Sequence, residues 1–342
     1  MATDRIAGIH HITAVASDPQ RTLDFYTRVI GLRLVKLTVN FDDPGTYHFY
    51  FGDEVGSPGT ILTFFPWPHV PQGEIGTGQV TAIAFEVPAQ SLEFWSKRLH
   101  DRALSIGAVE ERFGEEIVRF RDPDGLWLEL VGVSRVEDRP IAPSVEIPHE
   151  HAVRGFHSAT LSERDAAATE RLVEFMGFTR IGDAAHRIRY RASGRDASIV
   201  DIVREPKTPR GGLGAGIVHH IAFRTPTDER QARWRRELMP QVREITPVID
   251  RIYFHSIYFR EPGGVLFEIA TDPPGFAIDE TVDHLGEGLM LPPWLESARA
   301  DLEGRLPRLT RSGVPVAPSA CPRPSIRTPS GASSIAGPAE PT

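Results

Sequence analysis

Two histidine pairs are the side chains of this 342-residue chain that are best suited to chemistry. His10 and His11 occur in GIHHITAVAS, and His219 and His220 occur much later in GIVHHIAFRT. Glu268 follows in the run VLFEIAT. Two imidazoles and one carboxylate form the facial ligand set that suits non-haem Fe(II) and leaves coordination positions open. The same donors accept Mn(II), Zn(II) or Co(II), so the residue types predict a divalent metal without deciding which one.

The alternation of side chains along a strand selects one histidine of each pair, because neighbours point to opposite faces of the sheet. His219 falls on the apolar face that packs against a helix, so His220 is predicted to face the concave side. The same count selects His11 over His10, and it leaves Glu268 opposite the apolar face of its own strand. His11, His220 and Glu268 are therefore the predicted metal ligands.

A fourfold internal repeat must position these residues. Each copy opens with a short apolar strand, continues with a helix and closes with further strands, in the order βαβββ. TAIAFEVP of the second copy aligns with HHIAFRTP of the fourth, and DPDGLWLELVG aligns with EPGGVLFEIAT. We therefore predict an α+β fold of four βαβββ modules. Their helices are expected over residues 18–31, 89–103, 163–177 and 228–239.

The four modules are predicted to form two tandem domains, over residues 5–140 and 150–290. The stretch SRVEDRPIAPSVEIPHEHAV, with its three prolines, is interpreted as the connection between them. Residues 312–342 are dominated by Pro, Ser, Ala and Gly, a composition that buries too little apolar surface to fold. They are predicted to be a disordered tail without a site.

Stacking the four modules gives each predicted ligand a set of equivalents. The position of His11 is held in successive modules by His11, Ala82, Ser158 and His220. The partner position in the closing strand is held by Thr63, Glu129, Asp201 and Glu268. Only modules one and four offer an imidazole, so the metal is predicted to lie between them, and Glu129 is interpreted as structural. The histidines without such support are interpreted as surface or packing residues, among them His48, His69, His100, His151, His186 and His284.

The bulk composition argues against several classes of function. With 38 Lys and Arg against 46 Asp and Glu, the formal net charge of −8 disfavours binding to a nucleic-acid backbone. Cys321, the single cysteine, falls in the tail, so neither a disulfide nor a thiolate site organises the fold. No apolar run approaches the roughly 20 residues of a membrane span, and the N-terminus lacks a secretory signal. We expect a cytoplasmic protein with no membrane or nucleic-acid partner; a homo-oligomer is left open.

The motifs resemble the vicinal oxygen chelate superfamily and, within it, the bacterial hydroquinone-type ring-cleaving dioxygenases. The resemblance spans residues 5–295 and rests on the stretch from GIHHITAVAS to TFFPWP, on IPHEHAVRGFHS, on GIVHHIAFRTP and on YFREPGGVLFEIATDPPGF. It implies tandem βαβββ modules curled around a metal with His11, His220 and Glu268 as ligands. It further implies an extradiol-type enzyme that uses Fe(II), or alternatively Mn(II), to open a small hydroquinone or catechol ring with O2.

The resemblance also implies further site residues. Tyr258, His10 and His219 would act in proton transfer or steady the developing charge. Arg251 and Thr13 would contact the substrate. Strict alternation turns His10 and His219 away from the metal, so a strand twist or a β-bulge is needed to bring them close.

Two features concern the substrate. His255 stands where the resembling family carries an acidic residue, which leaves the substrate preference open. Several aromatic side chains are candidates for the lining of an apolar cavity that would suit a phenolic ring, namely Phe41, Tyr47, Phe49, Tyr190 and Tyr253.

Three other activities of the superfamily stay open on the sequence alone. A glyoxalase-type isomerase using Zn or Ni would need a fourth protein ligand, and Thr63 stands where a second carboxylate is expected. A small-molecule-binding protein of the bleomycin-resistance kind would need no metal. A metal-dependent thiol transferase of the fosfomycin-resistance kind is the most distant alternative, because such proteins generally pair two short subunits.

Overall fold

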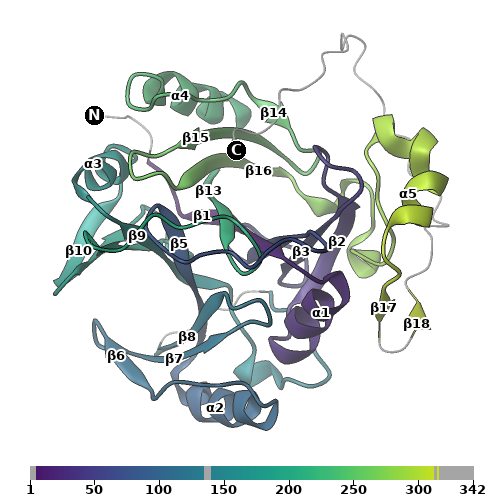
Figure 1. The fold of residues 1–342 in the computed structure, drawn as a ribbon, viewed down its shortest axis with the longest axis horizontal. Helices are drawn as coiled ribbons and strands as arrows, with labels where there is room; N and C mark the ends of the chain where they lie inside the picture. Colours follow the sequence, from purple (N-terminus) through teal and green to yellow (C-terminus); the bar gives the residue numbers. More distant parts are fainter. Residues whose placement is uncertain (1–4, 135–139, 312–313, 316–342) are drawn as a thin grey trace.

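Two eight-stranded mixed sheets, with helices at their periphery, form the body of the molecule (Figure 1). The computed structural model describes residues 5–134, 140–311 and 314–315. One sheet combines modules one and four, and the other combines modules two and three. Modules that are far apart in the chain therefore share a sheet. The arrangement confirms the predicted α+β fold of four modules.

The first sheet is built from modules one and four. Module one supplies β1 (Ile9–Ala16), α1 (Pro19–Asp24), a π-helical turn (Phe25–Val29), β2 (Arg33–Val39), β3 (Tyr47–Gly52) and β4 (Ile61–Pro66). Module four supplies β13 (Val218–Thr225), α4 (Asp228–Leu238), β14 (Ile249–Asp250), β15 (Phe254–Arg260) and β16 (Leu266–Pro274). The strand order is β14-β15-β16-β13-β1-β4-β3-β2, so β1 and β13 meet at the centre.

The second sheet repeats this plan. Module two supplies β5 (Gln79–Pro88), a 3-10 turn (Ala89–Ser91), α2 (Leu92–Asp101), β6 (Glu110–Arg112), β7 (Glu115–Arg121) and β8 (Trp127–Val133). Module three follows the 3-10 turn His149–His151 and supplies β9 (Phe156–Glu163), α3 (Ala167–Phe175), β10 (Thr179–Ala184), β11 (Arg187–Arg191) and β12 (Ile199–Arg204). The order β10-β11-β12-β9-β5-β8-β7-β6 places β5 beside β9, as β1 lies beside β13.

The strand registers confirm the alignment of the four modules residue by residue. In each module the first strand pairs in parallel with the closing strand. The predicted partner residue lies each time opposite the residue two positions after the His11 equivalent. The pairs are Thr13 with Thr63, Ala84 with Glu129, Thr160 with Asp201, and Ala222 with Glu268.

Local signals set the ends of the helix in module one. The Asp18 carboxylate accepts the N–H of Arg21 at 2.8 Å, and Pro19 occupies the first helical position, where its missing N–H costs nothing. Gly31 follows with φ of 80°, a conformation that favours glycine. The single helix expected over 18–31 is in fact a short α-helix that continues as the π-helical turn.

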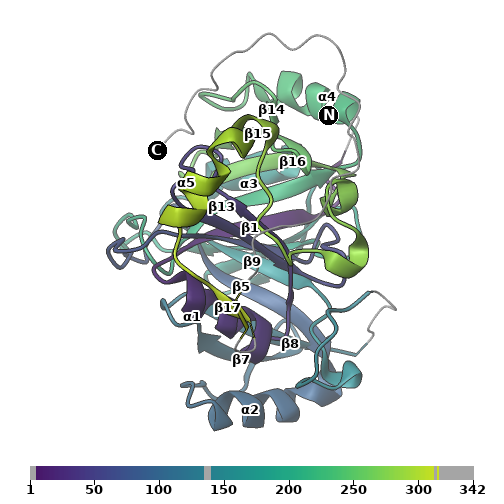
Figure 2. The same cartoon turned by 90° about the vertical axis from the view of Figure 1, so that its right-hand side faces the viewer.

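The C-terminal part of the described chain contains elements that the sequence analysis did not predict. Three 3-10 turns, Phe276–Ile278, Val282–His284 and Pro293–Ala298, lead to α5 (Arg299–Arg305), β17 (Thr310–Arg311) and β18 (Val314–Pro315) (Figure 2). We call residues 276–311 the C-terminal strap. The strap packs on module one, since the Tyr47 hydroxyl donates to the Pro307 carbonyl at 2.8 Å. The predicted tail at 312–342, with Cys321, lies outside the described residues apart from β18. None of the described helices is long and apolar enough to cross a membrane.

A buried pair of acidic side chains lies where the two sheets meet. Glu163, the last residue of β9, is fully buried, and its carboxyl group packs against the turn between β15 and β16. In that turn Glu261 accepts the Thr169 hydroxyl at 2.6 Å and the Val265 N–H at 2.8 Å. Burial and the neighbouring Glu261 raise the pKa of Glu163 to about 9. Glu163 is therefore the protonated member of the pair at neutral pH.

Replacing Glu163 by Gln should stabilise the protein at alkaline pH. The folded-state pKa, about 9, lies above the usual 4.5, so the stability contributed by this group is full at low pH and is lost as the pH rises towards 9. Gln cannot ionise, so the melting temperature of Glu163→Gln should exceed that of wild type more at pH 9 than at pH 6. Glu111→Gln, at an exposed position of β6, is the matched control and should show no such gain, because its carboxylate is not buried beside another acid. Parallel pH profiles for Glu163→Gln and wild type would contradict the assignment.

Candidate metal centre

Two β-bulges in the ladder between β1 and β13 decide where the four histidines point. The register skips His10 on β1 and His219 on β13, so each is an extra residue without a partner opposite. Strict alternation is broken at both places. The Nδ1 atoms of His10 and His11 lie 2.9 Å apart, and those of His219 and His220 lie 2.8 Å apart. The bulges thus bring His10 and His219 beside the predicted ligands, which alternation alone could not do.

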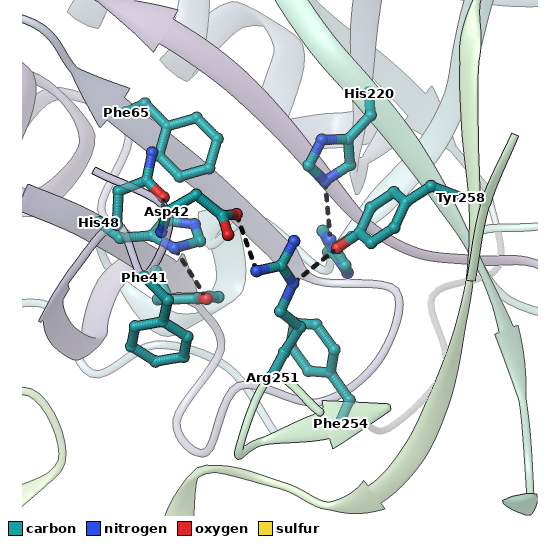
Figure 3. A pocket seen from close by; sticks show the side chains of 11 residues that line it. Phe41, Asp42, His48, Phe65, His220, Arg251, Phe254 and Tyr258 are labelled. Carbon is teal, nitrogen blue, oxygen red and sulfur yellow. Dashed lines mark hydrogen bonds and ion pairs between the residues drawn. The ribbon is translucent and has the colours of Figure 1, made fainter. Parts of the chain in front are cut away.

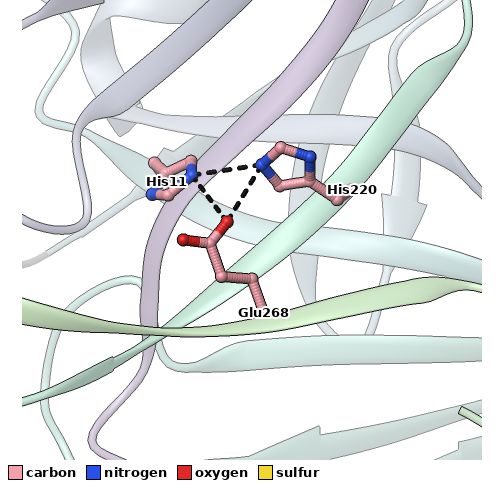
Figure 4. A group of neighbouring side chains, drawn as sticks. All are labelled: His11, His220 and Glu268. Atoms are coloured by element: carbon pink, nitrogen blue, oxygen red, sulfur yellow. Dashed lines mark hydrogen bonds and ion pairs between the residues drawn. The ribbon is translucent and has the colours of Figure 1, made fainter. Parts of the chain in front are cut away.

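His11, His220 and Glu268 converge on one point near the centre of the first sheet (Figure 4). The Nε2 atoms of His11 and His220 are 3.3 Å apart. Oε2 of Glu268 lies 3.2 Å from the former and 3.0 Å from the latter. All three side chains are buried. The structure therefore brings together the three residues predicted as ligands, from β1, β13 and β16.

The three separations fit the donor set of a single metal ion. Ligand atoms about 2.1 Å from an ion stand about 3.0 Å apart at right angles and about 3.4 Å apart at the tetrahedral angle. The observed triangle falls within that range, so one ion could contact all three atoms without moving a strand. Oε2 of Glu268 has no hydrogen bond of normal geometry among the described residues, although it is buried. A buried carboxylate oxygen without a hydrogen bond is unfavourable unless a cation compensates its charge.

The Glu268 carboxylate is held in place from β15. Ser256 donates its hydroxyl to Oε1 at 2.5 Å, which leaves Oε2 to face the imidazoles. Burial alone would raise the pKa of Glu268, but His11 and His220 hold it well below its usual value. Sequence reasoning missed Ser256; the available signal was its position two residues before Tyr258, on the same strand face. The carboxylate is thus ionised and oriented by the protein itself.

Burial lowers the pKa of three of the imidazoles around the site, those of His10, His219 and His220. Burial lowers the pKa of His220, and burial together with His11 holds the pKa of His10 well below its usual value. Burial likewise lowers the pKa of His219 to about 4. A neutral imidazole carries one N–H, so within each pair one Nδ1 must donate to the other. With Nε2 of His11 and His220 as ligand atoms, their Nδ1–H groups donate to His10 and His219, an arrangement that fixes ring orientation and raises basicity.

A narrow pocket, which we call the site pocket, opens onto His11 and His220 (Figure 3). It encloses about 330 Å³ of empty space, its mouth included. Its aromatic walls are Phe41, Tyr50, Phe65, Phe254 and Tyr258. Apolar walls with a few convergent polar groups are typical of small-molecule sites, and flat walls of this kind suit a planar ring.

Arg251 and Tyr258, both predicted for the site, form one side of the site pocket (Figure 3). Nε of Arg251 donates to the Tyr258 hydroxyl at 3.3 Å, and the guanidinium pairs with Asp42 at 2.9 Å. The Tyr258 ring stands edge-on to His220, with ring centres 5.7 Å apart. A fixed positive charge beside a phenol oxygen stabilises negative charge that develops nearby.

The interpretation of His48 as a surface or packing residue is wrong, because His48 lines the site pocket. Its Nδ1 accepts the Tyr50 hydroxyl at 2.9 Å, and its Nε2 lies 3.0 Å from the Thr63 hydroxyl, which donates to Thr13 at 2.7 Å. This series of hydrogen bonds makes Nε2 of His48 the protonated nitrogen, and burial holds the pKa of His48 well below its usual value.

Thr13, which was expected to contact the substrate, is the last member of this hydrogen-bond series. It lies behind Thr63 and does not line the site pocket.

The remaining candidates lie elsewhere. His255 is directed to the start of α4, where its Nδ1 lies 2.6 Å from the Asp228 carboxylate, so it does not line the site pocket. Of the aromatic candidates, Phe41 lines the site pocket and Tyr253 a second pocket. Tyr47, Phe49 and Tyr190 instead pack in the hydrophobic core. Of the other histidines interpreted as surface or packing residues, four are exposed, namely His69, His100, His186 and His284, and His151 stacks on Phe94.

The second sheet carries ion pairs at the equivalent position. Its ladder between β5 and β9 has the same two irregularities, which skip Thr81 and His157. Glu129 accepts two N–H groups of Arg112 at 2.8 and 3.1 Å, and Asp201 is similarly held by arginines of β11. The contacts confirm Glu129 as a structural carboxylate.

The chain belongs to the Glyoxalase/Bleomycin resistance protein/Dioxygenase superfamily, which its sequence matches over residues 8–130 and 142–269. The two segments are tandem copies of the family domain. The superfamily resemblance noted from the motifs is thereby confirmed.

Individual relatives extend this comparison. The "Putative ring-cleaving dioxygenase MhqO" of Bacillus subtilis (strain 168) is 49% identical over 302 residues, which cover 88% of this chain and 96% of the relative. The "Chlorohydroquinone/hydroquinone 1,2-dioxygenase" of Sphingobium indicum is 35% identical over 317 residues, 87% of this chain and 95% of its own. A crystal structure of a "putative dioxygenase" from Bacillus subtilis subsp. subtilis str. 168 superposes with a TM-score of 0.87 at 47% identity, over 90% of this chain and 99% of that one.

Ser256→Ala should weaken metal binding without unfolding the protein. Loss of the hydroxyl frees Oε1 of Glu268, and removal of such an outer partner lowers metal affinity about 10- to 100-fold. Competition with a chromogenic chelator measures the Fe(II) affinity directly. Ser297→Ala, at an exposed position, is the matched control and should bind as wild type does. An unchanged affinity in Ser256→Ala would show that Ser256 does not orient the ligand.

Proposed function

We propose that this protein is an Fe(II)-dependent, extradiol-type dioxygenase that opens a hydroquinone or catechol ring with O2. The observation that carries the proposal is the convergence of His11, His220 and Glu268 beside an aromatic pocket. It is supported by a relative named as a chlorohydroquinone/hydroquinone dioxygenase, which matches this chain over 95% of its own length. Two imidazoles and a carboxylate favour Fe(II), with Mn(II) as the alternative.

His11, His220 and Glu268 would hold the ion, which supplies open coordination positions for a substrate oxygen and for O2. The protein positions the ring with the flat side chains of Phe41, Phe65 and Phe254. Because the site pocket is narrow, a bound ring also displaces water from the ligands. A drier site strengthens the electrostatic interactions of the charged groups that remain.

In this proposal Arg251 stabilises negative charge on the substrate, and Tyr258 takes part in proton transfer. The Tyr258 hydroxyl accepts a hydrogen bond from Arg251, so its own proton points away from Arg251 and can be donated to a different group. The guanidinium favours the ionised form of a phenolic substrate. The Nε2–H of His48 is engaged by Thr63, so His48 acts here by holding the wall of the site pocket in place.

The structure offers less support for the alternatives. The isomerase chemistry asks for a fourth protein ligand, but the metal-ligating group among the described residues consists of three side chains. Thr63, which stands where that carboxylate is expected, has its hydroxyl committed to Thr13 and His48. A metal-free binding protein would have no need of three buried ligand atoms at contact distance.

Oxygen uptake tests the proposal. The protein is purified without oxygen, loaded with Fe(II) and given hydroquinone or catechol; we expect O2 consumption and loss of the aromatic absorbance. His11→Ala, His220→Ala and Glu268→Ala should each lose both bound iron and turnover, because each removes a ligand. Retention of metal and activity in all three variants would refute the site. Turnover of methylglyoxal with glutathione, in place of O2 uptake, would identify the isomerase.

Tyr258→Phe should lower kcat by about 100-fold or more while leaving the iron content unchanged. The variant keeps the ring against His220 and removes only the hydroxyl that Arg251 contacts. Steady-state O2 uptake and iron analysis measure the two quantities. Tyr47→Phe, which removes a hydroxyl bonded to the distant strap, is the matched control and should turn over normally. A wild-type kcat in Tyr258→Phe would exclude the hydroxyl from the reaction.

A further inference from the structure

A second pocket lies behind the wall of the site pocket. His10, Ile61, Phe254 and Phe276 form its buried inner end, and Ser57 and Ala277 lie toward its mouth. The second pocket encloses about 600 Å³ of empty space, its mouth included, whereas the site pocket encloses about 330 Å³. The roomier space is thus the one that the ligands do not line.

The ring of Phe254 is the partition between the two pockets, since it lines both. Its centre lies 5.0 Å from the ring centre of His11, on the ligand side, and 5.1 Å from that of His10, on the other side. Tyr50 and Phe276 pack nearby in the same aromatic cluster. The partition at Phe254 is a phenyl ring, which makes no hydrogen bonds, so a change in its tilt would cost packing contacts only.

The inner end of the second pocket suits a small apolar molecule better than water. Asp272, which lines this pocket, is already paired with Arg224 at 3.0 and 2.7 Å. His10 turns its Nδ1 to His11, and its buried Nε2, which has no hydrogen bond of normal geometry among the described residues, offers a water at most one polar partner. A buried water needs about two to four polar partners, and apolar cavities instead stay dry and accept apolar molecules such as xenon.

Two reactants must reach the metal centre in the proposed reaction. A ring bound in the site pocket covers the approach to His11 and His220, because that pocket has so little free space. Dioxygen that arrives after the ring therefore needs another route. We propose that the second pocket is a dioxygen site and that the Phe254 ring is the gate through which O2 passes to the ligands. The inference rests on the proposed function.

Ala277→Trp tests the route from the outside. Ala277 is exposed at the second pocket and touches none of the ligands, so an indole ring there should obstruct the pocket and leave the iron site intact. We expect the KM for O2 to rise severalfold, with the KM for hydroquinone, the iron content and the kcat at saturating O2 unchanged. Ala167→Trp, at an exposed position of α3, is the matched control. An unchanged KM for O2 in folded Ala277→Trp overturns the proposal.

Xenon provides a readout that does not depend on turnover. Crystals of the wild-type protein under xenon pressure should show the atom against Phe254 and Phe276, and crystals of Ala277→Trp should show less or none. Absence of xenon from the second pocket of wild type overturns the proposal. Failure of the proposed function gives a different result: wild type itself would consume no O2 with any ring substrate. That result would refute both the proposed function and the gate. O2 uptake with an unaffected KM in Ala277→Trp would refute the gate alone.

Discussion

The β-bulges at His10 and His219 are the constraint on which the site depends. A regular antiparallel ladder would send these two imidazoles to the far face and leave the Nδ1 atoms of His11 and His220 without them. At each bulge one residue loses its regular strand pairing, and its imidazole contacts that of the next histidine. The Nδ1 atoms are 2.9 Å apart for His10 and His11 and 2.8 Å apart for His219 and His220. The two bulges occupy corresponding places in modules one and four, so the same local distortion orients both nitrogen ligands.

The second sheet shows that the same scaffold has another way to neutralise a buried carboxylate. Its ladder is irregular at the corresponding residues, but Glu129 and Asp201 are compensated there by arginine side chains. A buried ionised group needs a cation or several hydrogen bonds. In the first sheet the described residues around Glu268 offer one serine hydroxyl and two imidazoles. Guanidinium groups neutralise the carboxylates of the second sheet, and a metal ion would do the same for Glu268 in the first.

The convergence of His11, His220 and Glu268 could be predicted from sequence because two periodicities agree on it. The module repeat made His11 and His220 equivalent, and alternation placed Glu268 on their face, which the strand registers bear out. His48 and Ser256 could not be found in this way, because their contacts run between neighbouring strands whose pairing a single strand does not specify. Three further features were not predicted, for a related reason: the bulges, the π-helical turn and the C-terminal strap. They are local departures from the periodicities that the prediction uses.

The distribution of the ligands along the chain gives metal binding a second consequence. His11 stands at the start of the chain, whereas His220 and Glu268 stand in module four, so the ion would join β1 to β13 and β16 directly. In the unfolded chain these groups are far apart, and a ligand that binds only the folded arrangement stabilises it in proportion to its affinity. Ion binding would therefore contribute to closing the first sheet as well as to the proposed reaction. Modules one and four are separated by the whole second sheet in sequence, and an ion at their junction links the two ends of the fold.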